Sequence, residues 1–269
     1  MKYKIVFSDI DGTVITDEHK VLPSTAKAVH QLAEINVPFV LVSARMPQAM
    51  RTVSVQMKTN IPLISYGGAY ILKADGTVLH DERINAADAK AVIAELKEQW
   101  HDKAVVNYYA ADEWYVEDKN DPAVQREEHI VDVQAKQAQF DVLLQKGIMP
   151  NKILCMSEPP VCEKLEQELK EKFPQLQIVR SSPILLEIMN KSVSKSAGIK
   201  ILLNHLGLSC EQAIAFGDNY NDVDMLQMAG LGVAMANAPQ AVKNAADAVT
   251  DSNNDGGIYN YLAKLNLVN

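Results

Sequence analysis

The 269-residue sequence has few cysteines, and none lies in a spacing typical of a metal site. Its three cysteines, Cys155, Cys162 and Cys210, are odd in number and include no Cys-x-x-Cys pair. Such a set does not form a disulfide framework, and cysteine-based zinc sites need paired ligands. We therefore expect buried free thiols in a reducing compartment, which favours a cytoplasmic protein.

Excess positive charge and long apolar runs are also missing. The formal net charge is −8, whereas a nucleic-acid-binding protein needs a basic face. No apolar stretch approaches the roughly 18 residues that a membrane span needs, and no signal-peptide-like region precedes the first predicted strand. We therefore expect no nucleic acid and no membrane among the partners. An anionic substrate is still compatible with this charge, because a metal ion can reverse the local sign.

Hydrophobic residues make up 48% of the chain, enough for a sizeable core. Strand and helix patterns alternate up to Asp81, with Ser24 as the expected N-cap of the first helix, and alternate again after Leu186. Continuous apolar runs such as 39–42 are typical of strands buried on both faces of a parallel sheet. The pattern predicts an α/β fold, with one doubly wound parallel sheet built from both ends of the chain.

The middle of the chain has a different texture. A predicted amphipathic helix at 86–100 is followed by short strands with exposed aromatic side chains, at 105–109 and 114–116. A charged helix and further strands follow up to residue 180. We interpret this stretch as an α+β domain inserted into the core. The predicted organisation is core 1–83, insert 84–187 and core 188–269.

The most informative motif is Asp9-Ile-Asp11-Gly12-Thr13, which directly follows the apolar run Ile5-Val6-Phe7. It places two carboxylates at the end of a buried strand, and open α/β sheets bind ligands at the carboxyl ends of their strands. Taken alone, the motif is equally compatible with an ordinary strand-to-helix turn, because Asp-Gly is a common turn pair.

A second acidic cluster, Gly217-Asp218-Asn219-Tyr220-Asn221-Asp222, follows the predicted strand 213–216. Its alternative interpretation is an Asx turn in which Asp222 caps the next helix. Repetition favours a functional role, because in one parallel sheet both clusters lie at the same edge. Gathered carboxylates repel one another unless a cation lies among them, and Mg²⁺ prefers such oxygen ligands.

Two further segments add a hydroxyl and a cation. Ser43-Ala44-Arg45 follows the strand at 39–42, where a hydroxyl and backbone N–H groups can hold phosphate oxygens. Lys195 lies in the first turn of a predicted helix, where a cation opposes the helix dipole, which indicates a negative partner. A polar loop and a solvated lysine are the alternatives when each segment is considered alone.

Together the four segments resemble the four motifs of the haloacid dehalogenase-like hydrolase superfamily. The motifs are Asp9-x-Asp11-Gly12-Thr13, Ser43, Lys195 and Gly217-Asp218-x-x-Asn221-Asp222. The insert resembles the type C2B cap of the Cof-type phosphatases of subfamily IIB in position and length. One departure is Ser43-Ala44-Arg45, where these phosphatases usually have Thr-Gly-Arg. Serine keeps the hydroxyl, and alanine can alter how closely the backbone approaches a phosphate.

The resemblance implies a phosphatase that hydrolyses phosphomonoesters of small metabolites, such as sugar phosphates, through an aspartyl-phosphate. Asp9 would be the nucleophile and Asp11 the general acid and base. Mg²⁺ would be bound by Asp9, Asp218 and the backbone carbonyl of Asp11. The phosphate would be held by Ser43, Ala44, Lys195 and Asn221, with support from Gly12, Thr13, Arg45 and Asp222.

The insert is expected to select the substrate, with a small phosphorylated metabolite as the partner. Its candidate contacts are Tyr108, Tyr109, Trp114, Tyr115 and Arg126, for which packing within the insert is the alternative. Two other functions share these motifs: a phosphomutase of the same superfamily, and a non-catalytic phospho-aspartate switch. A mutase would yield an isomer rather than inorganic phosphate, and a switch would keep its phosphoryl group without turnover.

Overall fold

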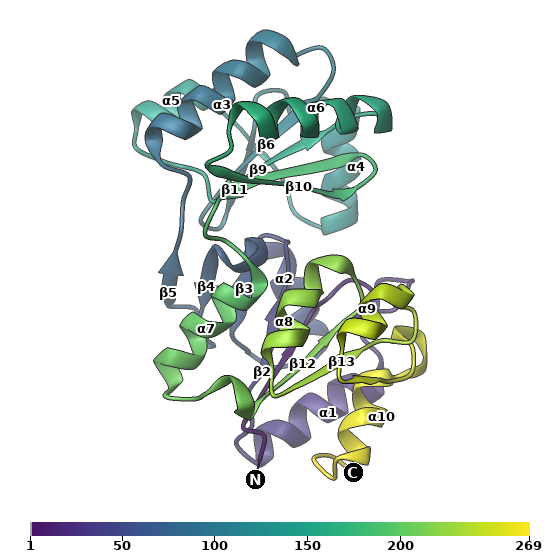
Figure 1. The fold of residues 1–269 in the computed structure, drawn as a ribbon. Helices are drawn as coiled ribbons and strands as arrows, with labels where there is room; N and C mark the ends of the chain where they lie inside the picture. The colour runs from purple at the N-terminus through teal and green to yellow at the C-terminus, as the bar shows by residue number, and fades with distance from the viewer. Residues whose placement is uncertain (1) are drawn as a thin grey trace. The chain divides into compact units, whose positions relative to one another are not determined.

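The computed structural model describes residues 2–269, which form two compact units. One unit, here called the core, runs up to His80 and resumes at Ser194–Asn269, and the other, called the cap, spans Asp81–Val193. The mixed α/β architecture is visible in Figure 1. No helix among residues 2–269 combines the length and the apolar character that crossing a membrane would require.

An eight-stranded sheet forms the centre of the core, in the order β14-β13-β12-β1-β2-β3-β4-β5. Strands β14 to β3 of this order run parallel, and β4 is antiparallel to β3. Strand β1 pairs with both β12 and β2, so the two ends of the chain meet in one sheet, as predicted. The strands are β1 (Ile5–Ser8), β2 (Phe39–Val42), β3 (Leu63–Ser65), β4 (Tyr70–Leu72), β5 (Val78–Asp81), β12 (Ala213–Gly217), β13 (Leu231–Ala234) and β14 (Ala248–Val249).

Helices cover both faces of the core sheet. On one face, α7, α8 and α9 bury apolar side chains such as Leu202 and Leu226 against Phe7 and Val40. Helices α1 and α10 contact each other on the opposite side, as Figure 1 shows, and Tyr261 of α10 meets Phe216 edge-on. The helices are α1 (Pro23–Glu34), α2 (Pro47–Gln56), α7 (Lys195–Leu206), α8 (Val223–Met228), α9 (Gln240–Ala245) and α10 (Gly257–Lys264).

The start of α1 differs from the prediction. Its N-cap is Leu22 rather than Ser24, and Pro23 occupies the first helical position. Proline suits this position because its missing N–H would have no partner in the first turn and its φ is already helical. The proline signal therefore outweighs the capping preference of serine. Helix α10 was not predicted at all.

The cap has a six-stranded sheet of order β10-β11-β9-β6-β7-β8 with α3, α5 and α6 packed on one face. Its strands are β6 (Val105–Ala110), β7 (Glu113–Val116), β8 (Lys136–Gln137), β9 (Lys152–Met156), β10 (Leu176–Ser182) and β11 (Leu185–Asn190). Its helices are α3 (Ala86–Gln99), α4 (Pro122–Val131), α5 (Phe140–Gln145) and α6 (Pro159–Lys172). The predicted domain division stays a prediction, and its second boundary, at residues 187–188, falls inside β11.

The prediction of exposed aromatic residues in the cap is wrong. Tyr108, Tyr109 and Trp114 are at most 5% exposed. Tyr108 stacks on Phe140 at 5.3 Å, and Trp114 stacks on Tyr109 at 5.7 Å. Both faces of this part of the sheet are therefore covered, which the alternation of side chains along β6 and β7 does not reveal. Tyr115 is half-buried and Arg126 is exposed.

The three cysteines are free, as predicted. Cys155 and Cys162 are buried as expected, whereas Cys210, in the short 3₁₀ turn η2 (Cys210–Gln212) ahead of β12, is only half-buried.

Candidate active site at the carboxyl edge of the core sheet

The sheet register brings the predicted loops to one edge. Ser8 of β1 is level with Phe216 of β12 and with Leu41 of β2. The chain continues into Asp9 from β1, into Ser43 from β2 and into Asp218 from β12, so three separate segments end together. The Asp9 backbone N–H still donates to the Phe216 carbonyl at 3.0 Å, which extends the ladder up to the carboxylate.

Lys195 joins this edge from the start of α7. Its Nζ donates to Asp9 Oδ1 at 2.5 Å and to Asp222 Oδ1 at 2.6 Å. All three side chains are buried, with Lys195 only 3% exposed. The two carboxylates offset the unfavourable position of a cation in the first helical turn. The expectation of a negative partner for Lys195 is therefore confirmed.

The loop after β12 is organised by Asp222. Its Oδ2 accepts hydrogen bonds from the backbone N–H groups of Asp218 and Asn219, at 2.9 and 3.0 Å. Its Oδ1 is taken by Lys195. The side chain thus faces the loop and the lysine, although Asp222 precedes α8 in sequence. Because both oxygens are engaged, Asp222 acts as a support of this loop. Asn221, in the 3₁₀ turn η3 (Tyr220–Asp222), is exposed.

Asp218 is held on the other side of the site. Thr13 Oγ1 donates to Asp218 Oδ1 at 3.0 Å, and Asn237 Nδ2 lies 3.4 Å from Asp218 Oδ2. Asn237 also donates to the Gly12 carbonyl at 2.8 Å. Gly12 has a φ of +75°, and a Cβ there would lie 2.3 Å from Asp218 Oδ2. Only glycine therefore fits between the two acidic loops.

Asn237 is a site residue that the predicted set omits. It follows β13, the next parallel strand after β12. A polar residue after a further buried strand of the same sheet was the signal available in the sequence. Its amide links the first and the fourth motif, because it contacts both Gly12 and Asp218.

Burial dominates the electrostatics of the cluster. It raises the pKa of Asp9 above its ordinary value, with Lys195 opposing the rise and Asp222 and Asp11 adding to it. Burial also raises the pKa of Asp218 to about 6. The pKa of Lys195 is raised in spite of its burial, because Asp222 and Asp9 stabilise its charge. Three carboxylates face one ammonium group, so the fully ionised cluster keeps two uncompensated negative charges.

The same residues can hold a metal ion. Carboxylate oxygens of Asp9, Asp218 and Asp222 lie within 4.8 Å of one another. Since both oxygens of Asp222 already accept hydrogen bonds, Asp9 and Asp218 are the better ligand candidates. Hard divalent cations bind such oxygen donors, and one of them would balance the excess charge.

The loop after β2 begins with Ser43, at the same edge of the core sheet as Asp9. Ser43 is buried, its N–H donates to the Ile64 carbonyl at 2.9 Å, and its carbonyl accepts from the Gly67 N–H at 2.9 Å. Its Oγ accepts from the Arg45 N–H at 3.1 Å. Ala44 is half-buried in the same loop. Gly68, where a Cβ would meet the Ser194 carbonyl at 2.2 Å, lets the neighbouring loop pack against the start of α7.

Arg45 reaches across to the first motif. Its Nε donates to Asp11 Oδ2 at 2.9 Å, and its Nη2 donates to Asp11 Oδ1 at 2.6 Å. The two carboxylates of the first motif therefore have separate partners, Lys195 for Asp9 and Arg45 for Asp11.

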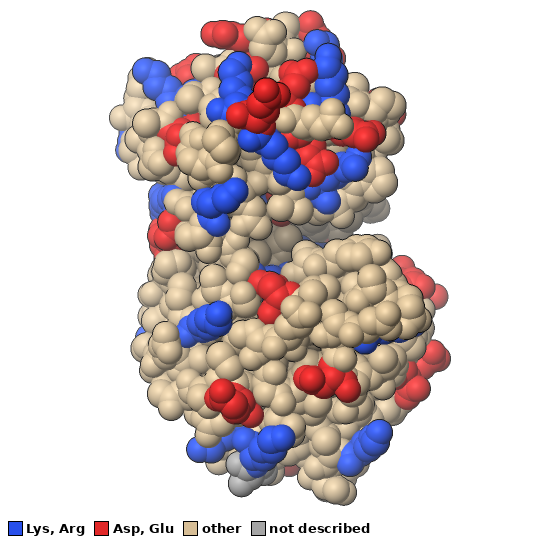
Figure 2. All heavy atoms as spheres, viewed as in Figure 1, with Lys and Arg blue, Asp and Glu red and all other residues tan. Residues whose placement is uncertain are grey.

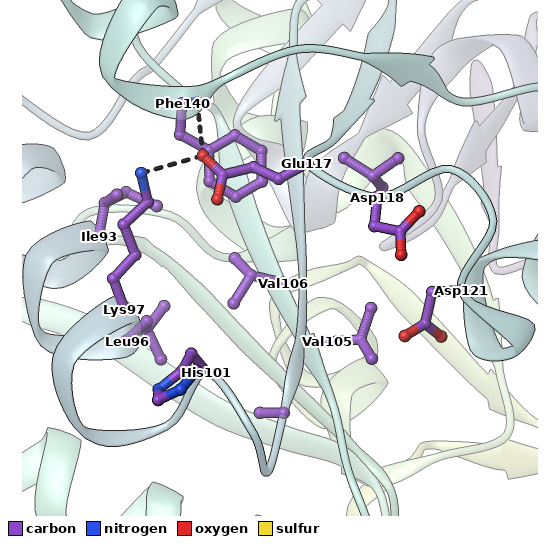
Figure 3. A pocket seen from close by; sticks show the side chains of 12 residues that line it. Ile93, Leu96, Lys97, His101, Val105, Val106, Glu117, Asp118, Asp121 and Phe140 are labelled. Atoms are coloured by element: carbon purple, nitrogen blue, oxygen red, sulfur yellow. Dashed lines mark hydrogen bonds and ion pairs between the residues drawn. The ribbon is translucent and has the colours of Figure 1, made fainter.

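The cap contains a cavity of about 170 Å³ with apolar walls and a polar rim (Figure 3). Lys97 points toward Glu117 and forms ion pairs with Glu117 at 2.9 Å and with Asp141 at 2.8 Å. Glu117 also accepts from the Phe140 N–H at 2.9 Å. These partners satisfy one another, and the residues that line the cavity include no serine, threonine or cysteine.

Comparison with known proteins agrees with this geometry. A family model described as haloacid dehalogenase-like hydrolase matches residues 6–262. A Haemophilus influenzae protein that is named as a phosphatase, without a stated substrate, is 36% identical over 258 residues, which are 96% of each chain.

Solved structures share the fold over nearly the whole chain. A protein from Thermotoga maritima has a TM-score of 0.87 at 28% identity and covers 97% of both chains. A sugar phosphatase described as subclass IIB of the same superfamily has a TM-score of 0.83 at 24% identity. This likeness covers 98% of the present chain and 100% of the other, and it establishes the fold alone.

Proposed function

We propose that this chain, which belongs to the haloacid dehalogenase-like hydrolase family and is a phosphatase of that family, is Mg²⁺-dependent. We further propose that it hydrolyses phosphomonoesters of small metabolites through an aspartyl-phosphate on Asp9. The observation that carries this proposal is the position of Asp9, buried at the strand edge between Lys195 and the Asp218 loop. A buried carboxylate of this kind is both a nucleophile candidate and a metal ligand candidate.

Asp9, Asp218 and the backbone carbonyl of Asp11 would hold Mg²⁺. Support comes from the charge of the cluster, whose two uncompensated negative charges match one divalent cation. When bound, Mg²⁺ would screen the approach of one anion to another and stabilise the charge of the transferring phosphoryl group. Thr13 and Asn237 would keep Asp218 in place, because both contact its carboxylate.

In the first half-reaction, the Asp9 oxygen attacks the phosphorus. The bond between phosphorus and the leaving-group oxygen breaks, and the electron pair stays on that oxygen, which takes a proton from Asp11. In the second half-reaction, Asp11 accepts a proton from water, whose oxygen attacks the phosphorus and releases Asp9. Inorganic phosphate and the alcohol are the products, and both side chains return to their starting states.

Ser43 and Lys195 would bind the phosphoryl oxygens together with the Ala44 backbone. Lys195 offers a charge within 2.5 Å of Asp9 Oδ1, where the incoming group would be attached. Donors already aimed at the position of developing charge stabilise the transition state without further reorganisation. Asn221 would join them only if the exposed loop after β12 turns inward.

The proposed substrates are small phosphorylated metabolites, with sugar phosphates as the first class to examine. The core residues recognise only the phosphate, so the rest of the molecule would be selected by the cap. The subclass IIB sugar phosphatase with the same fold supports this choice. We further propose a cytoplasmic location, because all three cysteines are free.

The decisive experiment measures release of inorganic phosphate from a panel of phosphorylated metabolites, with Mg²⁺ and with EDTA. We expect turnover only with Mg²⁺, and Asp9→Asn should lower kcat by about 10⁴-fold or more, as removal of a catalytic nucleophile does. Asp75→Asn is the matched control, because Asp75 lies in an exposed hairpin turn of the core.

Other outcomes separate the alternatives. An isomeric sugar phosphate without phosphate release would identify a phosphomutase. A phosphoenzyme that persists for minutes without turnover would identify a switch. Near wild-type turnover by Asp9→Asn would exclude Asp9 as the nucleophile, and activity unaffected by EDTA would exclude the metal.

A further inference from the structure

Arg45 and Asp11 meet in a fork-to-fork ion pair within the core. Two different nitrogens of the guanidinium group bind the two different oxygens of the carboxylate, at 2.9 and 2.6 Å. Such a bidentate pair constrains orientation as well as distance, because the guanidinium is planar and its donors are fixed in direction. A lysine in the same place could supply the charge but not this constraint.

The base of Arg45 is fixed at two points. Its backbone N–H donates to Ser43 Oγ at 3.1 Å, and its carbonyl accepts from the Tyr66 N–H at 3.1 Å. The arginine side chain is only 16% exposed. The backbone of Arg45 is therefore fixed, and its side chain extends from the loop that contains the proposed phosphate-binding Ser43.

Asp11 has much less support of its own. Its side chain is 52% exposed, in contrast to the buried Asp9. A half-exposed aspartate samples several rotamers, and a general acid contributes only when it lies within hydrogen-bond reach of the leaving oxygen. The fork from Arg45 removes this freedom in the described structure.

We propose that Arg45 is the positioning residue for Asp11. This inference rests on the proposed function, in which Asp11 protonates the leaving oxygen as its bond to phosphorus breaks. Arg45 does not touch the reacting atoms; it keeps the Asp11 carboxyl group in place. The fork places Asp11 before the reaction; when Asp11 is protonated, one oxygen keeps an Arg45 donor and the other carries the proton to the leaving group.

This role has a signature that differs from phosphate binding. A misplaced general acid slows reactions with a basic leaving group most, because only those leaving groups need the proton as the bond breaks. Phenyl phosphate and p-nitrophenyl phosphate form a suitable pair of probes. They have similar shapes, and phenolate is the more basic leaving group. The ratio kcat/KM is the quantity to compare, because it covers the steps up to departure of the leaving group.

The experiment compares wild type, Arg45→Gln and Arg45→Lys with Mg²⁺ present. We expect Arg45→Gln to lower kcat/KM for phenyl phosphate by about tenfold to a hundredfold, within the usual contribution of general acid catalysis. The loss for p-nitrophenyl phosphate should be under about threefold on the same basis. Arg45→Lys should show the same selectivity with a smaller loss. Inhibition by inorganic phosphate should be unchanged in both variants.

Arg180→Gln is the matched control, because Arg180 forms a partly exposed ion pair with Glu166 in the cap, and its variant should behave as wild type. Equal losses on both substrates, or weaker inhibition by inorganic phosphate, would show that Arg45 binds phosphate and would overturn the inference alone. Wild-type rates in Arg45→Gln would also overturn it. A wild-type enzyme that cleaves neither substrate with Mg²⁺ would refute the proposed function, and the inference with it.

Discussion

The core and the cap each bury ionised side chains, but the described cluster of the core holds more carboxylates than ammonium groups. In the core, Lys195 faces Asp9 and Asp222, with Asp218 beside them. In the cap, Lys152 pairs with Glu187 at 3.6 Å, and both side chains are less than 10% exposed. A balanced pair satisfies itself, whereas an unbalanced cluster needs a further cation. The imbalance, rather than burial itself, marks the reactive site.

Exposed charged side chains, in contrast, do not mark the reactive site. In Figure 2, Lys, Arg, Asp and Glu gather densely over the cap helices, whereas the visible face of the core carries few of them. Two ion pairs lie on α6: Lys164 with Glu168, which are both exposed, and Lys170 with Glu166, which are partly exposed. Such pairs contribute little free energy because water screens them. The charge-rich surface is therefore the less informative of the two.

The largest expected effect comes from removing the core's own cation. Lys195→Met leaves Asp9 and Asp222 facing each other in a buried site, so the free energy of unfolding in EDTA should fall by about 3–5 kcal/mol at pH 8. Urea denaturation measures this change. Lys200→Met is the control, because Lys200 is exposed on the same helix. A loss below about 1 kcal/mol, the range of a surface pair, would contradict the view that Lys195 balances this cluster.

The second-largest expected effect is stabilisation of the protein by Mg²⁺, which tests whether the excess negative charge of the core binds a metal ion. At a Mg²⁺ concentration a hundredfold above its Kd, the wild type should gain about 2.7 kcal/mol at pH 7.5. Burial raises the pKa of Asp218 to about 6. Below that pH a proton must leave before Mg²⁺ binds, so the gain should shrink as the pH falls to 5.

Thermal unfolding with Mg²⁺, and with NaCl at equal ionic strength as control, measures this gain. Asp218→Asn should lose most of it at every pH. A gain that is independent of pH, or equal in Asp218→Asn, would place the metal elsewhere.

The balanced pair of the cap should behave differently. Glu187→Gln removes the carboxylate that pairs with the buried Lys152 at 3.6 Å, which should lower stability by about 2 kcal/mol, less than for the core. The effect is reduced because Lys152 also lies 5.2 Å above the ring of Tyr109. Urea denaturation with and without Mg²⁺ checks it, and Mg²⁺ should not offset the loss. If Mg²⁺ restored the stability of Glu187→Gln, the cap and the core would not differ in metal binding.

The smallest effect is expected at the edge of the cap sheet. Lys136 and Glu113 pair there at 2.6 Å, with side chains 60% and 41% exposed. Glu113→Gln should change stability by less than about 0.5 kcal/mol. Glu113→Gln, measured in the same denaturation assay, is the matched control for Glu187→Gln. An equal loss in both variants would show that burial does not separate the two cap pairs.

The core was the more predictable region. Its parallel strands are continuous apolar runs, and short polar motifs follow them directly, so the α/β class and the clustering of the acidic loops could be inferred. The helix at Lys195 was likewise predicted from local signals. At Ser24 a local rule failed, because Pro23 competes for the same helix start.

The cap was less predictable because its signals are not local. Tyr108 and Trp114 were expected to be exposed, yet they are covered by α5 and by the neighbouring strand residue Tyr109. Strand β11 was not predicted. It is held in the sheet by antiparallel pairing with β9 and β10, and β9 lies about 30 residues earlier in the chain. Antiparallel pairs of this kind leave no motif at their ends.

The sequence by itself determined the strand ends, and with them which residue types reach the edge of the core sheet. It also placed Asn237 after a further buried strand, although this residue was not recognised as part of the site. Tertiary structure decided the partnerships. Lys195 pairs with Asp9 and Asp222, whereas Arg45 takes Asp11. These pairings join residues up to 186 positions apart. They depend on strand register and helix placement, which are set by packing of the whole core rather than by any local run of residues.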